Sequence, residues 1–487
     1  MGRLKKVLVA NRGEIAVRIA RACREAGITS VLAYSEADDT RFVRRFFDEI
    51  TPIASYLDVA AVIDAARKTG ADAIHPGYGF LSERAALSAA CAGAKIVFIG
   101  PKADSIAAMG SKAESRHLMQ KLGVPTVPGY DGEDQSDATL AAEAKRIGFP
   151  VLVKASAGGG GKGMKIVRAA EEVQPQIESA RREAKKAFGD DRLLLEKYIE
   201  EPRHVEVQVF GDSRGEIVHL FERDCSIQRR HQKVVEESPA PNYTDGLRQK
   251  MTAAAIAAAR GVKYENAGTV EFLVTPQREF YFLEMNTRLQ VEHPVTELVT
   301  GTDLVRAQFA VAAGEPLPWK QSDLRQRGHA IEVRVYAEDP DNGYLPQTGT
   351  IEYLEEPSGP GVRVDSGVMQ GTTIGVNFDP MLAKLIAFAP SRDAAIARLD
   401  RALRDLVVLG LTTNISWLRR VVTHPAFREG NVSTRFLQDH EADLQSKLSE
   451  EVQQIAKALA AAPSGGLKPA ATRGVPSVWQ QLGSWGR

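Results

Sequence analysis

Residues 268–286 read GTVEFLVTPQREFYFLEMN, two apolar-rich runs on either side of the polar segment TPQR. Apolar side chains recur at every second position, a period typical of β-strands, and a short polar turn between two such runs predicts an antiparallel hairpin. A turn centred on Gln277 and Arg278 would place Glu271 directly opposite Glu284. Further runs of this period beyond residue 200 predict a mostly antiparallel sheet with added helices.

The two opposed glutamates predict a cation site. Directly opposed side chains have Cβ atoms about 4.5–5.5 Å apart, and like charges there are destabilising, so a positive group should lie between Glu271 and Glu284. Asn286 would share their face and add an amide oxygen. Such oxygen ligands suit Mg²⁺ bound together with substrate phosphates. The alternative is a solvated polar face of the sheet.

The next segment, TRLQVEHP at 287–294, predicts an anion site. Arg288, Gln290 and Glu292 alternate, and in an extended segment they would share the face of Glu284. A guanidinium can bind a small oxyanion through two hydrogen bonds, and a carboxylate beside it can accept a proton. Polar alternation alone also fits a solvent-exposed face, so the prediction depends on the adjoining cation site.

A glycine-rich segment, ASAGGGGKG at 155–163, lies between the strand-like runs VLVK and MKIV. Glycines let backbone N–H groups approach an anion closely, and the flanking lysines add positive charge. We therefore predict a hairpin that folds over the phosphates of a nucleotide. The alternative is a flexible turn, because glycine motifs alone are weak signals.

The first hundred residues alternate between strand-like and helical patterns. Apolar runs at 7–10, 30–34 and 95–99 are separated by amphipathic stretches that include 15–26 and 58–69. This alternation predicts a parallel sheet covered by helices. The first turn holds a single glycine, so the dinucleotide fingerprint is absent and NAD is not expected.

Residues 222–233, ERDCSIQRRHQK, form a dense charge run for which we expect a solvated loop. The acidic neighbours and the lack of interleaved aromatic residues argue against a nucleic-acid patch. His231 taken alone suggests a structural hydrogen bond. Cys225 suggests packing, because no base lies at the spacing of a nucleophile motif.

Composition narrows the class of protein. The 487 residues carry 62 basic and 62 acidic side chains, so no net charge attracts nucleic acid or an anionic membrane. Three cysteines without a Cys-x-x-Cys pair cannot build a disulfide framework and favour a reducing cytoplasm. No apolar run approaches the length of a transmembrane helix, so we expect a soluble, cytoplasmic protein.

Four more segments complete a family pattern: ANRGEIA at 10–16, HPGYGFLSE at 75–83, GSK at 110–112 and GHAIEVR at 328–334. Together with the segments above, they resemble, over residues 4–441, the biotin carboxylase component of biotin-dependent carboxylases, a member of the ATP-grasp superfamily. The resemblance implies a fold of the α/β and α+β classes. Its expected parts are a parallel, Rossmann-like N-terminal α/β domain (1–100), a linker (101–126), a mobile lid with the glycine-rich hairpin (127–199), a larger mixed-sheet C-terminal catalytic domain (200–441) and an extra tail (442–487). For the tail, a partner-docking segment and an inert extension are both open.

The resemblance also assigns binding residues. ATP would be bound by Lys112, Lys154, Gly160, Gly161, Glu196, Lys197, Ile199, His204, Gln228 and His231, which replaces the structural role expected for His231. Mg²⁺ or Mn²⁺ would be bound by Glu271, Glu284 and Asn286. Bicarbonate would be held by Lys233, Arg288, Gln290 and Val291.

The family's chemistry gives these residues their expected roles. ATP phosphorylates bicarbonate to carboxyphosphate, which decomposes to CO₂ and phosphate beside biotin. By resemblance, Glu292 is the general base on bicarbonate and Arg334 stabilises the biotin enolate. Tyr78 would lie near biotin. The expected catalytic set is completed by Lys233 and Arg288.

Partners are expected from the same resemblance. Biotin carriers attach biotin within Ala-Met-Lys-Met, and the one Met-Lys pair here, Met164-Lys165, lies at the glycine-rich hairpin. We therefore expect a separate biotin carboxyl carrier protein and separate carboxyltransferase subunits. A homodimer is expected through the helix of Arg18, Arg21 and Glu25, for which a solvated helix face is the alternative.

The final carboxyl acceptor stays open. An acyl-CoA is expected, as in the acetyl-CoA carboxylase of fatty acid biosynthesis, and the alternative is pyruvate or another 2-oxo acid. Two further functions compete with this interpretation: another ATP-grasp ligase, and a catalytically silent scaffold of a carboxylase complex.

Overall fold

The computed structural model describes residues 4–156, 164–229, 232–446 and 454. The chain divides into two compact units, residues 1–444 and 445–487. All elements described below belong to the first unit. Within the described residues, no helix is both long enough and apolar enough to cross a membrane.

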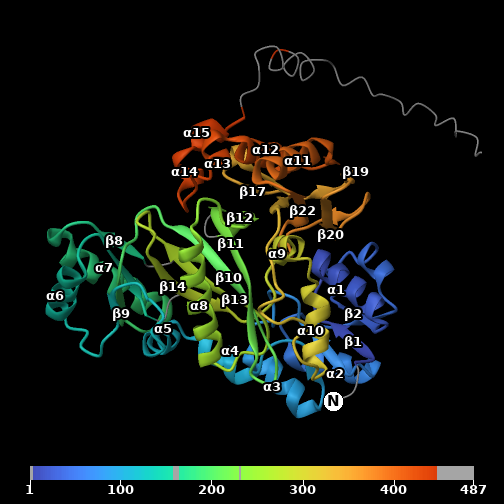
Figure 1. The fold of residues 1–487 in the computed structure, drawn as a ribbon, viewed down its shortest axis with the longest axis horizontal. Coiled ribbons are helices and arrows are strands. Elements are labelled where there is room, and N and C mark those ends of the chain that lie inside the picture. The colour runs from blue at the N-terminus through green and yellow to red at the C-terminus, as the bar shows by residue number, and fades with distance from the viewer. Residues whose placement is uncertain (1–3, 157–163, 230–231, 447–453, 455–487) are drawn as a thin grey trace, which may run out of the picture. The chain divides into compact units, whose positions relative to one another are not determined.

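The N-terminal part is a parallel five-stranded sheet with the strand order β3-β2-β1-β4-β5, shown in blue in Figure 1. Its elements are β1 (Lys6–Val9), α1 (Gly13–Ala26), β2 (Thr29–Tyr34), β3 (Glu49–Pro52), α2 (Val59–Thr69), β4 (Ala73–His75), α3 (Ala85–Ala94) and β5 (Val97–Phe98). Glycines in the left-handed conformation end α1 and α2 at Gly27 and Gly70. The predicted parallel sheet is confirmed, although the polar and exposed β3 was not predicted.

A small antiparallel sheet follows, with the order β6-β9-β7-β8. The elements are α4 (Ala103–Gly110), α5 (Lys112–Lys121), β6 (Gly129–Tyr130), α6 (Asp137–Ile147), β7 (Val151–Ala155), β8 (Lys165–Val167), α7 (Val173–Phe188) and β9 (Leu193–Lys197). Figure 1 shows α6 and α7 beside this sheet, and they share an apolar core with it that includes Leu140, Ile177 and Leu195. Residues 157–163 of the predicted glycine-rich hairpin lie outside the described residues.

The largest sheet has eight strands in the order β14-β13-β10-β11-β12-β15-β22-β20, and every pairing is antiparallel as predicted. Its strands are β10 (Arg203–Gly211), β11 (Ile217–Arg229), β12 (Gln232–Ser238), β13 (Asn266–Val274), β14 (Phe280–Asn286), β15 (His329–Tyr336), β20 (Val362–Ser366) and β22 (Met381–Ala389). Its helices are α8 (Asp245–Gly261), α9 (His293–Thr300), α10 (Leu304–Ala312), α11 (Arg392–Asp405) and α12 (Ile415–Thr423).

The remaining elements are short. They are β16 (Glu338–Asp339), β17 (Leu345–Pro346), β18 (Gly349–Thr350), β19 (Tyr353–Glu355), β21 (Thr373–Ile374), β23 (Val407–Leu409), α13 (Pro425–Arg428), α14 (Phe436–Asp439) and α15 (Glu441–Leu444). The predicted tail lies almost wholly outside the described residues.

The predicted register of the β13–β14 hairpin is correct at the site and wrong near the turn. Glu271 pairs with Glu284, as predicted, but Phe272 pairs with Phe282 because Leu283 forms a β-bulge. Phe282 is buried in the apolar core, whereas Leu283 is 39% exposed. A bulge accommodates one extra residue and bends its strand, so the two ends of β14 keep different registers.

Two expectations about local structure are wrong. Residues 222–233 are not a solvated loop: they belong largely to β11 and β12, and Glu222, Arg223 and Asp224 are buried. Residues 287–292 do not continue the strand, because the chain bends after Asn286 and turns into α9. Glu222, Arg223 and Asp224 of the first segment and Glu292 of the second are buried beside partners that compensate their charges.

Candidate active site

Lys233, on β12, is the centre of a buried charge cluster. Its Nζ atom lies 2.6 Å from Glu206 Oε2, 2.7 Å from Glu271 Oε1 and 2.7 Å from Glu292 Oε1. The lysine side chain is 11% exposed. Burial lowers the pKa of Lys233, but the three carboxylates raise it further, so that it stays well above its ordinary value. Lys233 is therefore a fixed cation.

Arg334, on β15, forms the second half of the cluster. Its Nε donates to Glu236 Oε1 at 2.6 Å, and its Nη2 donates to Glu292 Oε2 at 3.1 Å. Each oxygen of Glu292 therefore has its own cation, Lys233 on one side and Arg334 on the other. The sequence prediction placed Glu292, Lys233 and Arg334 in one site, and the structure brings all three together.

Glu292 is the N-cap residue of α9 and is fully buried. Burial raises the pKa of this carboxyl, but Lys233, Arg334 and the nearby Arg223 lower it more strongly, so that the pKa lies well below its usual range. The positive end of the α9 dipole acts in the same direction. Glu292 is consequently ionised at neutral pH and able to accept a proton once its cations are engaged elsewhere.

Three members of the cluster were missed by sequence reasoning: Glu206, Arg223 and Glu236. Glu206 pairs in register with Glu271, and its Oε1 lies 2.6 Å from Arg223 Nε. Arg223 is 0% exposed and also donates to Thr296 Oγ1 at 2.9 Å. The available signal was an acidic residue beside buried valines: Glu206 between Val205 and Val207, and Glu236 after Val235. Charged residues are rarely buried unless they are paired.

The predicted cation site is assembled by β13 and β14. Glu271 is buried, Glu284 lies opposite it, and Asn286 Nδ2 donates to Glu271 Oε1 at 2.8 Å. His204 Nε2 lies 2.9 Å from Glu271 Oε2. Lys233 and His204 therefore place cationic or hydrogen-bond-donating groups beside Glu271. The carboxylate and amide oxygens form a hard donor set that fits Mg²⁺ or Mn²⁺.

The side chains predicted to hold an anion lie around the same point. Gln290 Nε2 donates to Glu271 Oε1 at 3.2 Å. Arg288 Nη2 donates to Asn286 Oδ1 at 3.0 Å, while its Nε donates to Glu83 Oε2 at 2.9 Å. The carbonyl oxygen of Val291 accepts from Lys384 Nζ at 2.8 Å. These residues converge through the turn before α9 and not through a continued strand.

The predicted nucleotide residues are distributed over both antiparallel sheets. In the small sheet, Lys154 on β7 pairs with Glu196 on β9, which also accepts from Arg116 at 3.1 Å. Lys197 Nζ donates to the carbonyl oxygen of Phe149 at 2.6 Å. Ile199 lies two residues after the end of β9.

In the large sheet, Gln228 Nε2 lies 2.6 Å from His204 Nδ1. Lys112 is the first residue of α5, but its side chain lies outside the described residues. Gly160, Gly161 and His231 also lie outside them.

Tyr78 is half-buried and follows β4, where its hydroxyl donates to Glu14 Oε1. Glu14 Oε2 in turn lies 3.3 Å from Nζ of the fully buried Lys384 on β22. Burial and the charge of Glu14 raise the pKa of Tyr78 well above its ordinary value, so the phenol keeps its proton. The N-terminal domain thus supplies a neutral aromatic group beside the charged sheet.

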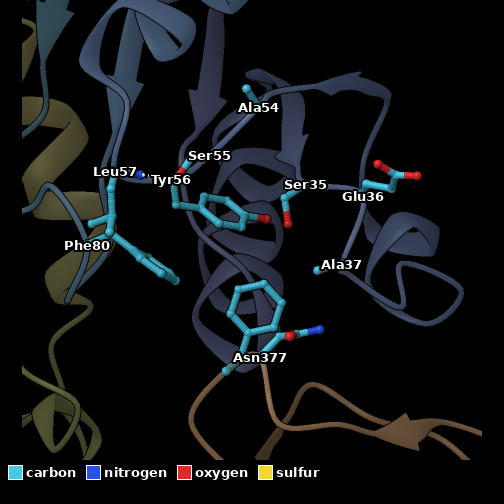
Figure 2. A pocket seen from close by; sticks show the side chains of 10 residues that line it. Ser35, Glu36, Ala37, Ala54, Ser55, Tyr56, Leu57, Phe80 and Asn377 are labelled. Atoms are coloured by element: carbon cyan, nitrogen blue, oxygen red, sulfur yellow. Dashed lines mark hydrogen bonds between the residues drawn. The ribbon is translucent and has the colours of Figure 1, made fainter.

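A separate cavity of about 570 Å³ opens near the carboxyl ends of β2 and β3. Figure 2 shows that Tyr56 and Phe80 line it, and their rings stack with centroids 4.7 Å apart. Its lining includes none of the charged residues of the Lys233 cluster. This cavity is therefore distinct from the candidate active site.

The fold and the site together define an ATP-grasp enzyme: a parallel α/β domain, a small sheet carrying Lys154, and a large antiparallel sheet carrying opposed glutamates. Family models match three consecutive segments of the chain. They are "Biotin carboxylase, N-terminal domain" over residues 3–106, "Carbamoyl-phosphate synthase L chain, ATP binding domain" over 111–320, and "Biotin carboxylase C-terminal domain" over 332–439. The chain belongs to the biotin carboxylase family, whose members are ATP-dependent ligases.

Individual relatives agree with this assignment. The chain is 49% identical over 442 residues to the biotin carboxylase of Halalkalibacterium halodurans, covering 90% of this chain and 98% of that protein. It is 50% identical over 450 residues to the alpha subunit of mitochondrial methylcrotonoyl-CoA carboxylase from Mus musculus. This match covers 91% of the chain but only 63% of the mouse protein.

A solved structure matches the fold closely. It is the biotin carboxylase domain dimer of the 2-oxoglutarate carboxylase from Hydrogenobacter thermophilus, in complex with MgADP, ADP and bicarbonate. The TM-score is 0.86 at 45% sequence identity, and the match covers 92% of this chain and 100% of that one.

Proposed function

We propose that this chain carboxylates biotin on a separate carrier protein, using ATP and bicarbonate through carboxyphosphate. The observation that carries the proposal is the position of Glu292, a buried carboxylate held between Lys233 and Arg334. Each of the two cations beside this carboxylate could stabilise an oxyanion. One base could therefore serve two successive steps, each of which forms an oxyanion. Similarity to relatives named biotin carboxylase supports the same reaction.

Bicarbonate would bind next to Lys233, contacted by Arg288, Gln290 and the backbone of Val291. When its negative charge approaches Lys233, the ion pair between Lys233 and Glu292 weakens and the basicity of Glu292 rises. Glu292 then accepts the bicarbonate proton, and the resulting dianion is the nucleophile for the γ-phosphorus of ATP.

ATP would be held between the two antiparallel sheets. Its proposed contacts are Lys112, Lys154, Gly160, Gly161, Glu196, Lys197, Ile199, His204, Gln228 and His231. Glu271, Glu284 and Asn286 would hold Mg²⁺ or Mn²⁺, which supplies charge neutralisation at the phosphates when bound. Closure of a lid formed by residues 127–199 would keep water away from carboxyphosphate.

Biotin would lie between Tyr78 and Arg334. The phosphate released from carboxyphosphate takes the ureido proton, and the guanidinium of Arg334 stabilises the enolate oxygen. Arg334 stays protonated throughout, because its neighbouring carboxylates hold its pKa well above the ordinary value in spite of burial.

The partners and acceptor are proposals as well. A biotin carboxyl carrier protein and a carboxyltransferase would complete the enzyme, with an acyl-CoA as the acceptor. Methylcrotonoyl-CoA carboxylase among the relatives supports an acyl-CoA, whereas acetyl-CoA and fatty acid biosynthesis have no specific support. A 2-oxo acid is the alternative, supported by the 2-oxoglutarate carboxylase structure.

The proposal also covers the domain boundaries, the oligomeric state and the cellular compartment of the protein. We keep the division into 1–100, 101–126, 127–199, 200–441 and 442–487, which places the small sheet within the lid. A homodimer is supported by the dimeric structural relative. The cytoplasm is supported by three buried cysteines that form no disulfide.

The test is ATP hydrolysis by the purified chain with Mg²⁺, measured without addition, with bicarbonate, and with bicarbonate plus free biotin. We expect hydrolysis that depends on bicarbonate and rises with biotin, and we expect Glu292→Gln to abolish it. The exposed Glu315 supplies the control variant Glu315→Gln, which should behave as wild type. Hydrolysis that ignores bicarbonate and biotin would favour another ATP-grasp ligase, and ATP binding without hydrolysis would favour the scaffold.

A further inference from the structure

Two glutamates with no assigned role face each other beside Arg334. Glu236 on β12 pairs in register with Glu332 on β15, and both side chains are 0% exposed. Directly opposed side chains in an antiparallel pair have Cβ atoms about 4.5–5.5 Å apart. Two ionised carboxylates at that distance in a buried site would repel each other strongly.

The hydrogen bonds of this pair are incomplete. Glu236 Oε1 accepts from Arg334 Nε at 2.6 Å. Among the described residues, Glu236 Oε2 and both oxygens of Glu332 are buried and have no hydrogen-bond partner. A buried carboxylate without donors is costly, whereas a protonated carboxyl is uncharged and can donate to its neighbour. One added proton would therefore remove the repulsion and satisfy two of the three oxygens.

We propose that Glu236 and Glu332 share one proton at neutral pH, so that the pair carries one negative charge instead of two and positions Arg334 with more of its positive charge available to biotin. The role of Arg334 toward biotin rests on the proposed function. Glu236 and Glu332 are positioning residues, since they act through the guanidinium. Arg334 already binds Glu236 and Glu292. A third ionised carboxylate would reduce its ability to stabilise an oxyanion.

The charged groups around Glu332 come from several elements. The groups that interact with Glu332 are Arg334 on its own strand, Glu236 on β12, Lys384 on β22, Glu292 at the N-cap of α9, and the neutral Tyr78. Lys384 also interacts with Glu14 on α1, and α9, which packs against β15, begins with the uncharged His293. Burial raises the pKa of Glu332; Lys384 lowers it, Glu236 raises it, and the pKa stays well above its ordinary value. Burial likewise raises the pKa of Glu236, to about 7. His293 is buried and uncharged, because burial lowers its pKa well below the ordinary value.

A direct test uses infrared difference spectroscopy of the full chain without substrates. Subtracting the Glu332→Gln spectrum from the wild-type spectrum at pH 7 should reveal the carbonyl stretch of one protonated carboxyl. Glu236→Gln should shift or remove this band, because it takes away the carboxyl with which Glu332 shares the proton. The matched control is Glu237→Gln, since Glu237 is equally buried on β12 but ionised by His329 and Arg392, and its removal should leave the band in place.

A kinetic test addresses positioning. Loss of the shared proton should make the biotin-dependent kcat/KM of the wild type fall about tenfold per pH unit on the alkaline side. Glu332→Gln, which cannot ionise, should remove this fall. The absence of a protonated carboxyl at pH 7, or a wild-type pH profile in Glu332→Gln, would overturn the proposal. The infrared result does not depend on biotin chemistry, so it separates failure of the carboxyl pair from failure of the proposed function.

Discussion

At the scale of single residues, the site depends on buried charges that compensate one another. Lys233 has three carboxylate partners, and Glu292 has two cationic ones. Removal of one member leaves its partners buried with less counter-charge, which can cost more than the net contribution of the pair itself. Stability and the proposed catalysis therefore depend on the same residues.

Lys233→Met should lower the free energy of unfolding by about 3–5 kcal/mol, because it removes the cation that three buried carboxylates share. The measurement is urea denaturation followed by circular dichroism. Lys165→Met is the matched control, since the ion pair of Lys165 with Glu183 is exposed, and its effect should be much smaller. Equal losses in the two variants would contradict this account of the cluster.

Glu237 should make the protein less stable as the pH falls. Burial raises the pKa of this carboxyl, but its hydrogen bonds and charge interactions with His329 and Arg392 outweigh burial and lower the pKa from 4.5 to about 2. A depressed folded-state pKa stabilises the protein above pH 4.5, and this stabilisation is lost as the pH falls toward 2. The difference amounts to about 3 kcal/mol.

Denaturation of wild type and Glu237→Gln between pH 7 and pH 2 measures this contribution. We expect the variant to be less stable at neutral pH and to converge on the wild type in acid. A constant difference between the two proteins across this range would show that Glu237 does not titrate as described.

Sequence patterns predicted part of this cluster. The opposition of Glu271 and Glu284 followed from hairpin geometry alone, and the structure confirms it. Glu206 and Arg223 were missed because a charged residue in a strand is usually solvated. Only the fold brings β10, β11 and α9 together, so that Arg223 meets Glu206 and Thr296.

At the scale of elements, helices and strands were predictable where the period was regular. The amphipathic stretches at 15–26 and 58–69 form α1 and α2 over nearly the predicted spans. The bulge at Leu283 was not predictable from alternation, because one extra residue shifts the register without changing composition. The segment after Asn286 was likewise taken as extended, although α9 begins there at His293, with Glu292 as its N-cap and Pro294 in its first turn.

The contact between α1 and the turn after β20 is unusually close. A Cβ atom added at Gly367 would lie 2.6 Å from the backbone nitrogen of Glu14. Gly367→Ala should therefore displace the first turn of α1, lower the free energy of unfolding by about 1–3 kcal/mol, and raise KM for biotin through Glu14 and Tyr78. Thermal unfolding and biotin titrations measure both effects.

Gly375→Ala is the control for this substitution, because a Cβ there meets no atom within 4 Å. It should leave both quantities near wild type. If Gly367→Ala is destabilised but its KM for biotin is unchanged, the close packing at Gly367 stabilises the fold without setting the position of Tyr78.

At the scale of the whole molecule, ion pairs join the N-terminal domain to the large sheet. Glu297 on α9 lies 2.8 Å from Arg18 on α1 and 2.8 Å from Arg363 on β20. The solvated helix face considered for Arg18 is thus wrong, because this side chain is 10% exposed. Arg21 and Glu25 remain candidates for a homodimer contact.

Glu297→Gln should weaken both ion pairs and lower the free energy of unfolding by about 3 kcal/mol. We expect a double-mutant cycle with Arg18→Met to give strong coupling, measured by urea denaturation. A cycle between Glu315→Gln and Arg18→Met should give none. Additive effects of the Glu297 and Arg18 substitutions would mean that this ion pair does not join the two parts of the fold.

The distance in sequence between Arg18 and Glu297 also has a consequence during synthesis. The two residues are 279 positions apart. At roughly 5–20 residues per second, a ribosome would need about 15–55 seconds to make Glu297 after Arg18. Throughout that interval α1 presents a cationic side chain and part of an apolar face with no counterpart yet made. The nascent N-terminal domain therefore has to stay soluble with this face of α1 uncovered until the later part of the chain has been made.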